Sequence, residues 1–512
     1  MSQPLIRDRL WSPAAVAAAI LLYLGLHFAA RLAMAPTLGI DDAEQALFAQ
    51  QFAWGYRFRQ PPLFTWLLLQ VFGLFGTNIL SVSIVRYVLL AVCYGCFYLT
   101  ARRCIADPRL AGLAVLSNAL IYVFAFFSHH DLTHTTALAA SIAATFYVFV
   151  RLADAPTLPN YVLLGLCLGV GMLSKWNFAI LATALPLACL VLPAYRPLVL
   201  SIRTVAAVLA FAAVVSPSLA WLYANVGSFS ALAVDITGAR PAAGWASTVV
   251  QGSGELAAAL VVFPQPFLLI FLAVFGATLW RGVKAPAAAA APAVRAEFLG
   301  VVMLIAIALH WILVPTIGAV AFTERWMQPA LMILPVFLFA LVERGRPSNR
   351  AIAVYLGIVA LFVAVAFGAR IVRYAQGADY CGSCRALAPF AALSDQLRAA
   401  GLAPGTLVTD SFHVGGNLRV GFPDSRIVVP GFPAAVWPGP TDAGRCMAVW
   451  RADDPVDDRM PAAIAAYLAD PLAGDPAAPH IAGSVEANMI GSQTRVLRLR
   501  YTVYDDPQGD CR

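Results

Sequence analysis

The chain of 512 residues is 61% hydrophobic and only 12% charged, and its mean hydropathy is +0.76. Soluble domains carry about 25% charged residues and roughly 45 to 50% apolar residues, so this composition excludes a soluble globular protein. The net charge of +7 does not indicate nucleic-acid binding. Many of the basic residues stand in short loops between apolar runs, where they orient a membrane protein.

Apolar runs along the chain predict eleven membrane-spanning helices of about 20 residues each. The predicted spans are residues 12–34, 79–101, 110–128, 133–151, 161–174, 178–194, 204–223, 256–280, 298–316, 327–342 and 351–370. The first run is longer than the apolar region of a signal peptide, so it is expected to stay as a helix. The run 62–76 is too short for a crossing and is predicted to be an interfacial helix.

The lysines and arginines are unevenly divided between the two sets of loops. Alternate loops, beginning with the N-terminal segment, hold fourteen of them. The opposite loops up to residue 371 hold five: Arg57, Arg59, Lys175, Arg240 and Arg325. Because basic loops stay in the cytoplasm, this asymmetry predicts a cytoplasmic N-terminus and a C-terminus outside the cytoplasm.

A soluble domain is predicted for residues 372–512, where Asp, Gly and Pro become frequent. β-like runs stand at 406–410, 426–429, 447–450 and 494–503, and helix-like stretches stand at 389–400 and 460–469. We therefore expect a polytopic α-helical membrane domain over residues 1–371, with a first outer loop at 35–78. An extracytoplasmic α/β domain should follow it.

Four of the nine cysteines lie in this C-terminal domain: Cys381, Cys384, Cys446 and Cys511. An even number in an extracytoplasmic domain predicts two disulfides with three possible pairings. The preferred pairing is Cys381 with Cys384 and Cys446 with Cys511. The Cys381-Gly-Ser-Cys384 sequence also fits a redox motif, although it lacks the preceding strand of a thioredoxin-like fold.

Acidic residues gather in the first outer loop, at Asp41, Asp42 and Glu44. Ionisable groups beside a bilayer are costly, which favours a functional role for them. The structural alternative is a capping box, with Asp41 as N-cap and Glu44 at N3 of a helix that runs to about Trp54.

Basic residues on the same predicted face are Arg57, Arg59, Lys175 and Arg325. Each could be a snorkelling anchor beside lipid headgroups. Fixed cations at this face could equally bind an anionic substrate.

A second polar cluster, between the third and fourth predicted spans, contains His129, His130, Asp131 and His134. Imidazole and carboxylate groups are ligands for divalent metals, and His130 and His134 would share a helix face. The alternative has Asp131 as the N-cap of the next helix and the histidines as interfacial residues. A metal site built on His129, His130 and Asp131 is therefore one of two interpretations.

Several short motifs in a fixed order resemble glycosyltransferase family 39, the bacterial branch of the protein O-mannosyltransferase superfamily, which includes the aminoarabinose transferases that modify lipid A. The motifs are Asp41-Asp42-Ala followed by Leu47-Phe48, Trp54-Gly-Tyr56, Pro61-Pro62-Leu-x-x-Trp66, Asp131, Leu173-Ser-Lys175 and Arg325-Trp326-x-x-Pro329. The resemblance covers roughly residues 12 to 345, and no single motif is specific.

The resemblance implies a GT-C fold and an inverting transferase whose outward-facing site uses a sugar on a polyprenyl phosphate. An acid of the first outer loop would act on the acceptor, and this sequence leaves the choice between Asp41 and Asp42 open, because Asp42 stands where Glu is common. Asp131 aligns with an acid of the second outer loop, whereas the flanking His129-His130 is not a family feature. The phosphate-binding candidates are Arg57, Arg59, Asp131, Lys175 and Arg325.

The sequence therefore predicts a polyprenyl-phosphate-sugar-dependent glycosyltransferase in the bacterial inner membrane, with its C-terminal domain in the periplasm. The acceptor would be a lipid A-like glycolipid, a glycan or a protein. No cofactor is expected to be required, because the departing phosphate is already a good leaving group, and a divalent metal remains an option. The alternative function is a lipid or small-molecule transporter, although no internal repeat is visible.

Overall fold

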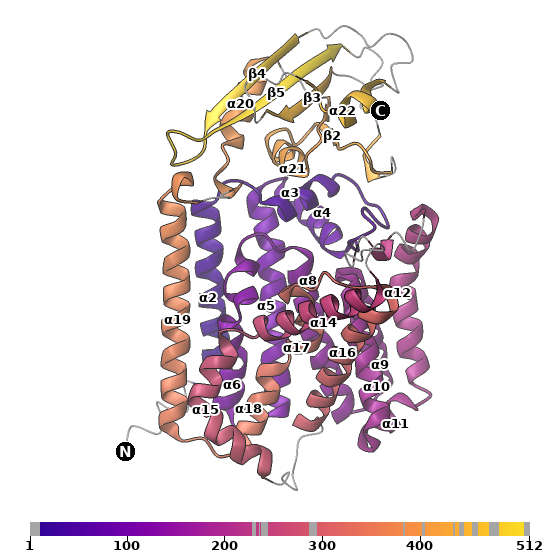
Figure 1. Ribbon diagram of the computed structural model, residues 1–512, viewed down its shortest axis with the longest axis vertical. Coiled ribbons are helices and arrows are strands. Elements are labelled where there is room, and N and C mark those ends of the chain that lie inside the picture. The colour runs from indigo at the N-terminus through magenta and orange to yellow at the C-terminus, as the bar shows by residue number, and fades with distance from the viewer. Residues whose placement is uncertain are drawn as a thin grey trace.

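The computed structural model describes residues 11–512 apart from 228–231, 235, 237–243, 286–293, 382–384, 402–404, 434–435, 440–444, 453–458, 470–480 and 506–512. A helical bundle carries a small sheet domain at one end (Figure 1). The principal helices of the bundle and its outer loop are α2 (Pro13–Met34), α3 (Ile40–Phe48), α4 (Leu63–Phe75), α5 (Ile79–Cys104), α6 (Pro108–Leu116), α7 (Tyr122–Ala125), α8 (His134–Asp154), α9 (Leu158–Ser174), α10 (Ala179–Val191), α11 (Arg196–Val199), α12 (Thr204–Asn225), α14 (Trp245–Val262), α15 (Phe267–Lys284), α16 (Ala296–Ile317), α17 (Gln328–Leu331), α18 (Leu334–Arg344) and α19 (Asn349–Ala375).

The long helices begin where a polar side chain can satisfy a free backbone amide. Ser12 accepts the Ala15 N–H at 3.2 Å before α2, and Asn78 accepts the Ser81 N–H at 2.9 Å before α5. Ser348 does the same for α19, where it accepts from Ala351 N at 3.1 Å. These are ordinary N-caps, and they set the start of three apolar helices.

In the described residues seven helices are long and apolar enough to cross a membrane, or up to nine if each of two bent pairs is one span. The remaining two of the eleven predicted spans are α9, which has only 17 residues, and the run 110–128, which is broken into α6, a 3-10 turn and α7. The count of eleven is therefore not confirmed. A membrane-protein fold with many apolar helices is confirmed.

One predicted span is wrong. Residues 256–280 were expected to form a single helix, but α14 ends at Val262 and α15 begins at Phe267. Pro264 and Pro266 lie between them, and proline in a helix interior removes a hydrogen bond and clashes with the preceding turn. The predicted interfacial segment 62–76 forms helix α4, with Phe64, Leu68 and Phe72 packed in one cluster with residues of α5.

The predicted inner loops meet at one end of the bundle. At the end of α18, Arg344 Nη1 donates to Glu297 at the start of α16 at 2.6 Å. Arg109 in α6 donates to Asn349 at the start of α19 at 2.7 Å. From that end α19 runs the length of the bundle to the sheet domain (Figure 1). The predicted inner loops thus lie at the end of the bundle opposite the sheet domain. Arg240, one of the basic residues of the predicted outer loops, lies outside the described residues.

The C-terminal domain contains a five-stranded sheet of order β2-β1-β3-β5-β4. Its elements are α20 (Phe390–Ala399), β1 (Thr406–Val408), α21 (Phe412–Gly421), β2 (Arg426–Val428), β3 (Arg445–Arg451), α22 (Ala462–Ala469), β4 (Ile481–Asn488) and β5 (Val496–Asp505). β1 pairs in parallel with β2 and β3, whereas β5 is antiparallel to both β3 and β4. All four predicted β-like runs and both predicted helices are confirmed, whereas β4 and α21 were missed.

Helix α21 docks this domain directly on α3. A Cβ placed on Gly416 would lie 2.1 Å from the carbonyl oxygen of Ala43, so only glycine permits this approach. Beside this contact Asn417 Oδ1 accepts the Leu38 N–H at 2.9 Å. Gln50 likewise exchanges two hydrogen bonds of 2.8 Å with the backbone of Ile427 in β2. The sheet domain therefore fixes the position of the first outer loop.

Cys381 and Cys446 each form part of a disulfide bond. Cys384 and Cys511 lie outside the described residues, so the preferred pairing of the four cysteines stays a prediction. The cysteines of the helical domain, Cys93, Cys96, Cys104, Cys167 and Cys189, are free.

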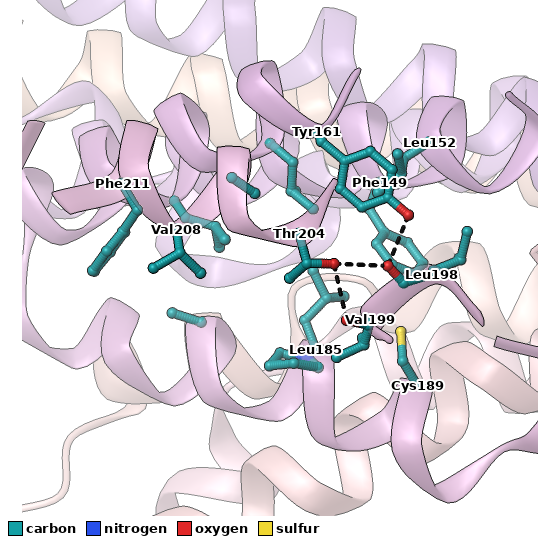
Figure 2. Close-up of a pocket in the computed structure, with 15 residues that line it drawn as sticks. Phe149, Leu152, Tyr161, Leu185, Cys189, Leu198, Val199, Thr204, Val208 and Phe211 are labelled. Carbon is teal, nitrogen blue, oxygen red and sulfur yellow. Dashed lines mark hydrogen bonds between the residues drawn. The ribbon is translucent and has the colours of Figure 1, made fainter. Parts of the chain in front are cut away.

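A cavity of about 230 Å³ lies between α8, α9, α10 and α12. Figure 2 shows that the Tyr161 hydroxyl and the Thr204 hydroxyl both donate to the Leu198 carbonyl, at 2.8 and 3.1 Å. The rest of the lining is almost entirely apolar, and it includes none of the predicted site residues.

Candidate active site

Asp131 caps the helix that carries the two acids of the first outer loop. Its Oδ2 accepts the Ile40 N–H at 2.9 Å, and its Oδ1 accepts the N–H groups of Asp41 and Asp42 at 3.0 and 3.2 Å. The N-cap residue of α3 is Gly39, which has no side chain to do this. The predicted capping box with Asp41 as N-cap is therefore wrong, and α3 ends at Phe48, well before Trp54.

Asp42 is held in a buried ion pair. Its Oδ1 accepts from Arg86 of α5, and its Oδ2 lies 3.7 Å from Arg31 Nη2 of α2. Asp42 and Arg86 are both fully buried. A carboxylate enclosed by two guanidinium groups serves as their counter-charge and is not turned toward a substrate.

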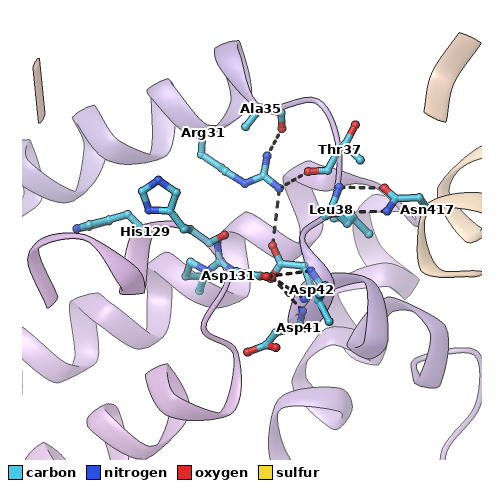
Figure 3. A network of polar contacts seen from close by, with 12 residues as sticks. Arg31, Ala35, Thr37, Leu38, Asp41, Asp42, His129, Asp131 and Asn417 are labelled. Atoms are coloured by element: carbon cyan, nitrogen blue, oxygen red, sulfur yellow. Dashed lines mark hydrogen bonds and ion pairs between the residues drawn. The ribbon is translucent and has the colours of Figure 1, made fainter. Parts of the chain in front are cut away.

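The Asp41 side chain points away from Asp42 and its two arginines. Figure 3 shows its carboxylate directed away from the network around Asp42 and Asp131, and its side chain is only partly buried. Burial raises the pKa of Asp41 to about 8, with further contributions from the charges of Asp131, Glu44 and Asp42, while Arg325 opposes this rise. A carboxylate with a pKa near neutral pH suits a general base, since its ordinary value is near 4.

Lys175 and Arg325 interact electrostatically with Asp41. Lys175 follows α9, and its Nζ donates to Thr135 Oγ1 at 3.1 Å. Burial lowers the pKa of Lys175 to about 8, helped by the charge of Arg325 and opposed by that of Asp41. Each of the three charges thus acts on the others. The two cations sit on separate segments, which are joined where Asn177 Nδ2 donates to the Trp326 carbonyl at 3.4 Å.

Arg57 and Arg59 gather around Glu44. Arg57 donates to Glu44 Oε1, and its guanidinium lies over the Phe412 ring, 5.6 Å from the centroid. Burial raises the pKa of Glu44, whereas Arg57 and Arg59 lower it. Trp176 Nε1 donates to the Phe58 carbonyl at 2.9 Å, so this arginine loop lies next to Lys175.

The histidine cluster does not form a metal site. The ring of His129 stacks on His27 at 3.7 Å, and its two nitrogens contact the hydroxyls of Tyr23 and Tyr87 at 2.8 and 3.3 Å. His130 Nδ1 contacts the Phe126 carbonyl at 2.8 Å. In the part of the chain that the structure describes, no three His, Cys, Asp or Glu side chains are grouped to hold a metal ion.

The metal-ligand interpretation of His129, His130 and Asp131 is therefore wrong for this cluster. Asp131 uses its carboxylate as a helix cap. His134 begins α8 while His130 precedes that helix, so the two do not share a helix face.

Three buried arginines escaped the sequence analysis: Arg31, Arg86 and Arg370. Arg31 and Arg86 lie within apolar helices, and together they fix Asp42. Arg370 of α19 likewise contacts His27 Nδ1 at 2.7 Å and donates to the His129 carbonyl at 2.9 Å. The available signal was a charged residue inside an apolar span, which marks a paired and functional position more often than a lipid-facing one.

The sequence has close relatives of known activity. Residues 59–221 match the family described as dolichyl-phosphate-mannose-protein mannosyltransferase. The lipopolysaccharide core galacturonosyltransferase RgtA of Rhizobium johnstonii is 30% identical over 439 residues, which are 84% of this chain and 85% of the relative. RgtB of the same organism is 30% identical over 464 residues, 90% of this chain and 91% of the relative.

The chain belongs to the same glycosyltransferase family as RgtA and RgtB. It is therefore a membrane glycosyltransferase of the GT-C superfamily, and the transporter interpretation has no support from these relatives. A crystal structure of ArnT from Cupriavidus metallidurans bound to undecaprenyl phosphate has the same fold, with a TM-score of 0.62 at 15% identity. That likeness covers 96% of this chain and 98% of ArnT, so it includes the C-terminal domain.

Proposed function

We propose that this enzyme transfers a galacturonosyl group from a polyprenyl phosphate to the core of lipopolysaccharide, with inversion at the anomeric carbon. The observation that carries the proposal is the electrostatic interaction of Asp41 with Lys175 and Arg325. A carboxylate of raised pKa that interacts with two cations supports a general base next to a phosphate-binding pair. The choice of sugar and acceptor is supported by the two galacturonosyltransferases that match most of the chain.

Asp41 acts as the general base. A hydroxyl of the acceptor attacks the anomeric carbon of the donor sugar, and Asp41 takes the hydroxyl proton as the new C–O bond forms. The bond between the anomeric carbon and the phosphate oxygen breaks from the opposite face, and its electron pair leaves with the phosphate. A single displacement of this kind inverts the anomeric configuration.

Lys175 and Arg325 stabilise the departing polyprenyl phosphate. Negative charge develops on the phosphate oxygens as the bond breaks, and fixed cations aimed at that charge lower the barrier. The charge of Lys175 depends on pH, because burial lowers its pKa to about 8. We propose that these two cations suffice, so that transfer requires no divalent metal. The arginines 57 and 59 beside them bind the donor or the acceptor at the edge of the same site.

The reaction takes place on the outer face of the bacterial inner membrane, with the N-terminus in the cytoplasm and the sheet domain in the periplasm. The proposal rests on the basic loops at the opposite end of the bundle. A reporter fused after Arg346 should be cytoplasmic, and one fused after Arg373 should be extracytoplasmic. Two reporters on the same side would overturn this orientation.

The direct test uses purified protein in detergent with polyprenyl-phosphate-linked galacturonic acid and core lipopolysaccharide. The expected result is a lipopolysaccharide product heavier by one galacturonosyl group, together with free polyprenyl phosphate. Donors carrying mannose or aminoarabinose serve as controls for the sugar. Transfer from one of these in preference to galacturonic acid would refute the assignment of the sugar and leave the transferase mechanism intact.

A further inference from the structure

A polar pocket lies between the sheet domain and the start of α3. Its volume is about 520 Å³, and its lining includes Ile40 together with Arg385, His413, Arg451 and Arg495. These four polar residues come from separate parts of the C-terminal domain. No residue in this pocket belongs to the machinery described above for proton transfer or phosphate binding.

The charge of the pocket is positive. Three guanidinium groups line it, and none of the lining residues that the structure describes is Asp or Glu. Arg495 is fixed in place, because its Nη1 donates to the carbonyls of Ala378 and Cys381, the latter at 2.9 Å. Arg385 is exposed. A planar guanidinium in a pocket whose described lining contains no Asp or Glu is suited to bidentate binding of carboxylate or phosphate.

His413 shows that the charges converge. Burial and the charges of Arg385 and Arg451 together lower the pKa of His413 to about 4, against a hydrogen bond with the Leu38 backbone that raises it. Both guanidinium groups therefore act on this ring. Its Nε2 is buried and has no hydrogen-bond partner. A buried polar atom without a partner is uncommon in a folded protein and suggests that a ligand supplies one.

The N-terminus of α21 adds to the positive electrostatic potential of the pocket. Ser411 is the N-cap of this ten-residue helix, and Ser411, His413 and Val414 all line the pocket. Free amides and the helix dipole favour an anion at this position.

The pocket lies next to the catalytic loop. Ile40 lines it, and Ile40 precedes Asp41 directly in the first turn of α3. A substrate held in the pocket by one group would therefore have other parts within reach of the loop that carries the base. The polyprenyl phosphate already has its own cations, so the pocket is better placed for the second substrate.

We propose that the pocket formed by Arg385, His413, Arg451 and Arg495 binds a carboxylate or phosphate group of the glycolipid acceptor and so selects an anionic acceptor. This inference rests on the proposed function in naming the acceptor. Lipopolysaccharide core regions carry such groups on their acidic and phosphorylated sugars, several bonds away from the hydroxyl that receives the new sugar.

The test substitutes Arg385 and Arg451 and leaves Arg495 in place, because Arg495 donates to the carbonyls of Ala378 and Cys381 and so helps to shape the pocket. Arg385→Gln, Arg451→Gln and the double variant are compared with Arg498→Gln, a control on β5 whose partner is the exposed Glu486. Each single change should raise the KM for core lipopolysaccharide about tenfold or more, as expected for a lost charge-assisted hydrogen bond. The KM for the donor and the slow hydrolysis of the donor by water should not change.

A binding measurement separates this inference from the proposed function. Fluorescently labelled core lipopolysaccharide should bind the wild-type protein and the control variant, and it should bind the double variant at least tenfold more weakly. If wild-type protein binds in this way but transfers no sugar, the proposed function fails and the pocket stands. If all variants transfer with the wild-type acceptor KM, the pocket assignment fails and the function stands.

A membrane phospholipid is the other source of a phosphate group. Phosphatidylglycerol added to the micelles should compete weakly with labelled lipopolysaccharide. Stoichiometric displacement by phosphatidylglycerol from the wild-type protein, absent in the double variant, would overturn the assignment of the pocket to the acceptor.

Discussion

Asp131 Oδ1 accepts the backbone N–H of Asp41 at 3.0 Å, across a separation of 90 residues in the chain. The carboxylate of one outer loop thus caps the helix that presents the base of another. Its second oxygen accepts from Ile40, so the two loops are held together at the start of α3. The position of Asp41, the proposed base, therefore depends on Asp131.

Asp131→Ala should lower both stability and activity. It removes the acceptors of three backbone amides, and loss of a helix cap typically costs about 0.5 to 2 kcal/mol of unfolding free energy. Asp131→Asn keeps one carbonyl acceptor and should retain more of both. Thermal unfolding and transfer rate, measured on the two variants side by side, check this. Equal behaviour of the Ala variant and wild-type protein would contradict the cap.

Asp42→Asn should be strongly destabilising. It leaves Arg86 and Arg31 buried without their counter-charge, and breaking a buried ion pair by removing one partner typically costs about 3 to 5 kcal/mol. The measurement is denaturant or thermal unfolding in detergent, with expression level as a second readout. A double change of Asp42→Asn with Arg86→Gln should recover part of the loss. A stable, inactive Asp42→Asn protein would instead make Asp42 the base.

The pH dependence of kcat/KM should be bell-shaped with a maximum near pH 8. Burial and neighbouring carboxylates raise the pKa of Asp41 to about 8, so the ionised base becomes more abundant as the pH rises. Burial and Arg325 lower the pKa of Lys175 to about 8, so the protonated cation becomes scarcer over the same range. Because kcat/KM reports the groups of the free enzyme, both limbs should be visible.

Lys175→Arg separates the two limbs of that profile. Arginine stays charged at any accessible pH, so this variant should keep its activity at alkaline pH while the acid limb remains. An unchanged alkaline limb in Lys175→Arg would show that a group other than Lys175 causes it.

Chelation should leave transfer unchanged. Asp131 and His129 already have protein partners, and two cations of the chain, Lys175 and Arg325, interact electrostatically with Asp41, the proposed base. Enzyme treated with EDTA and assayed in metal-free buffer should therefore transfer at the untreated rate. A loss of activity that Mg²⁺ or Mn²⁺ restores would contradict the proposal that cations of the chain suffice.

Local patterns in the sequence predicted the elements well. The strands β1, β2, β3 and β5 follow from short β-branched and apolar runs, and the apolar helices follow from length. The sequence also contained the signal for the break at Pro264 and Pro266, because a proline disfavours helix both at its own position and at the residue before it. The prediction of a single helix over 256–280 was wrong because it followed the continuous apolar run and not these two prolines.

The partners of the site residues could not be predicted in the same way. The motifs predicted that Asp41, Lys175 and Arg325 lie on one face of the membrane. They could not decide which of Asp41 and Asp42 is the catalytic acid. Only the three-dimensional fold pairs Asp42 with Arg86, which lies 44 residues away. The packing of α21 on α3 could not be predicted from the sequence either, because nothing in the sequence indicates that Gly416 contacts Ala43.

The most direct test of the central claim is the transfer rate of Asp41→Asn at saturating polyprenyl-linked donor and acceptor, beside its thermal unfolding. The Asp41 carboxylate makes no hydrogen bond within the described part of the chain, and its neighbours Asp131 and Glu44 repel it, so stability should be equal or slightly higher. Loss of a general base typically lowers a rate about 10²- to 10⁴-fold, and transfer should fall by that factor. Asp395→Asn, at an exposed position of α20, is the matched control and should transfer like wild-type protein. Near wild-type transfer by Asp41→Asn would contradict the assignment of Asp41 as the base.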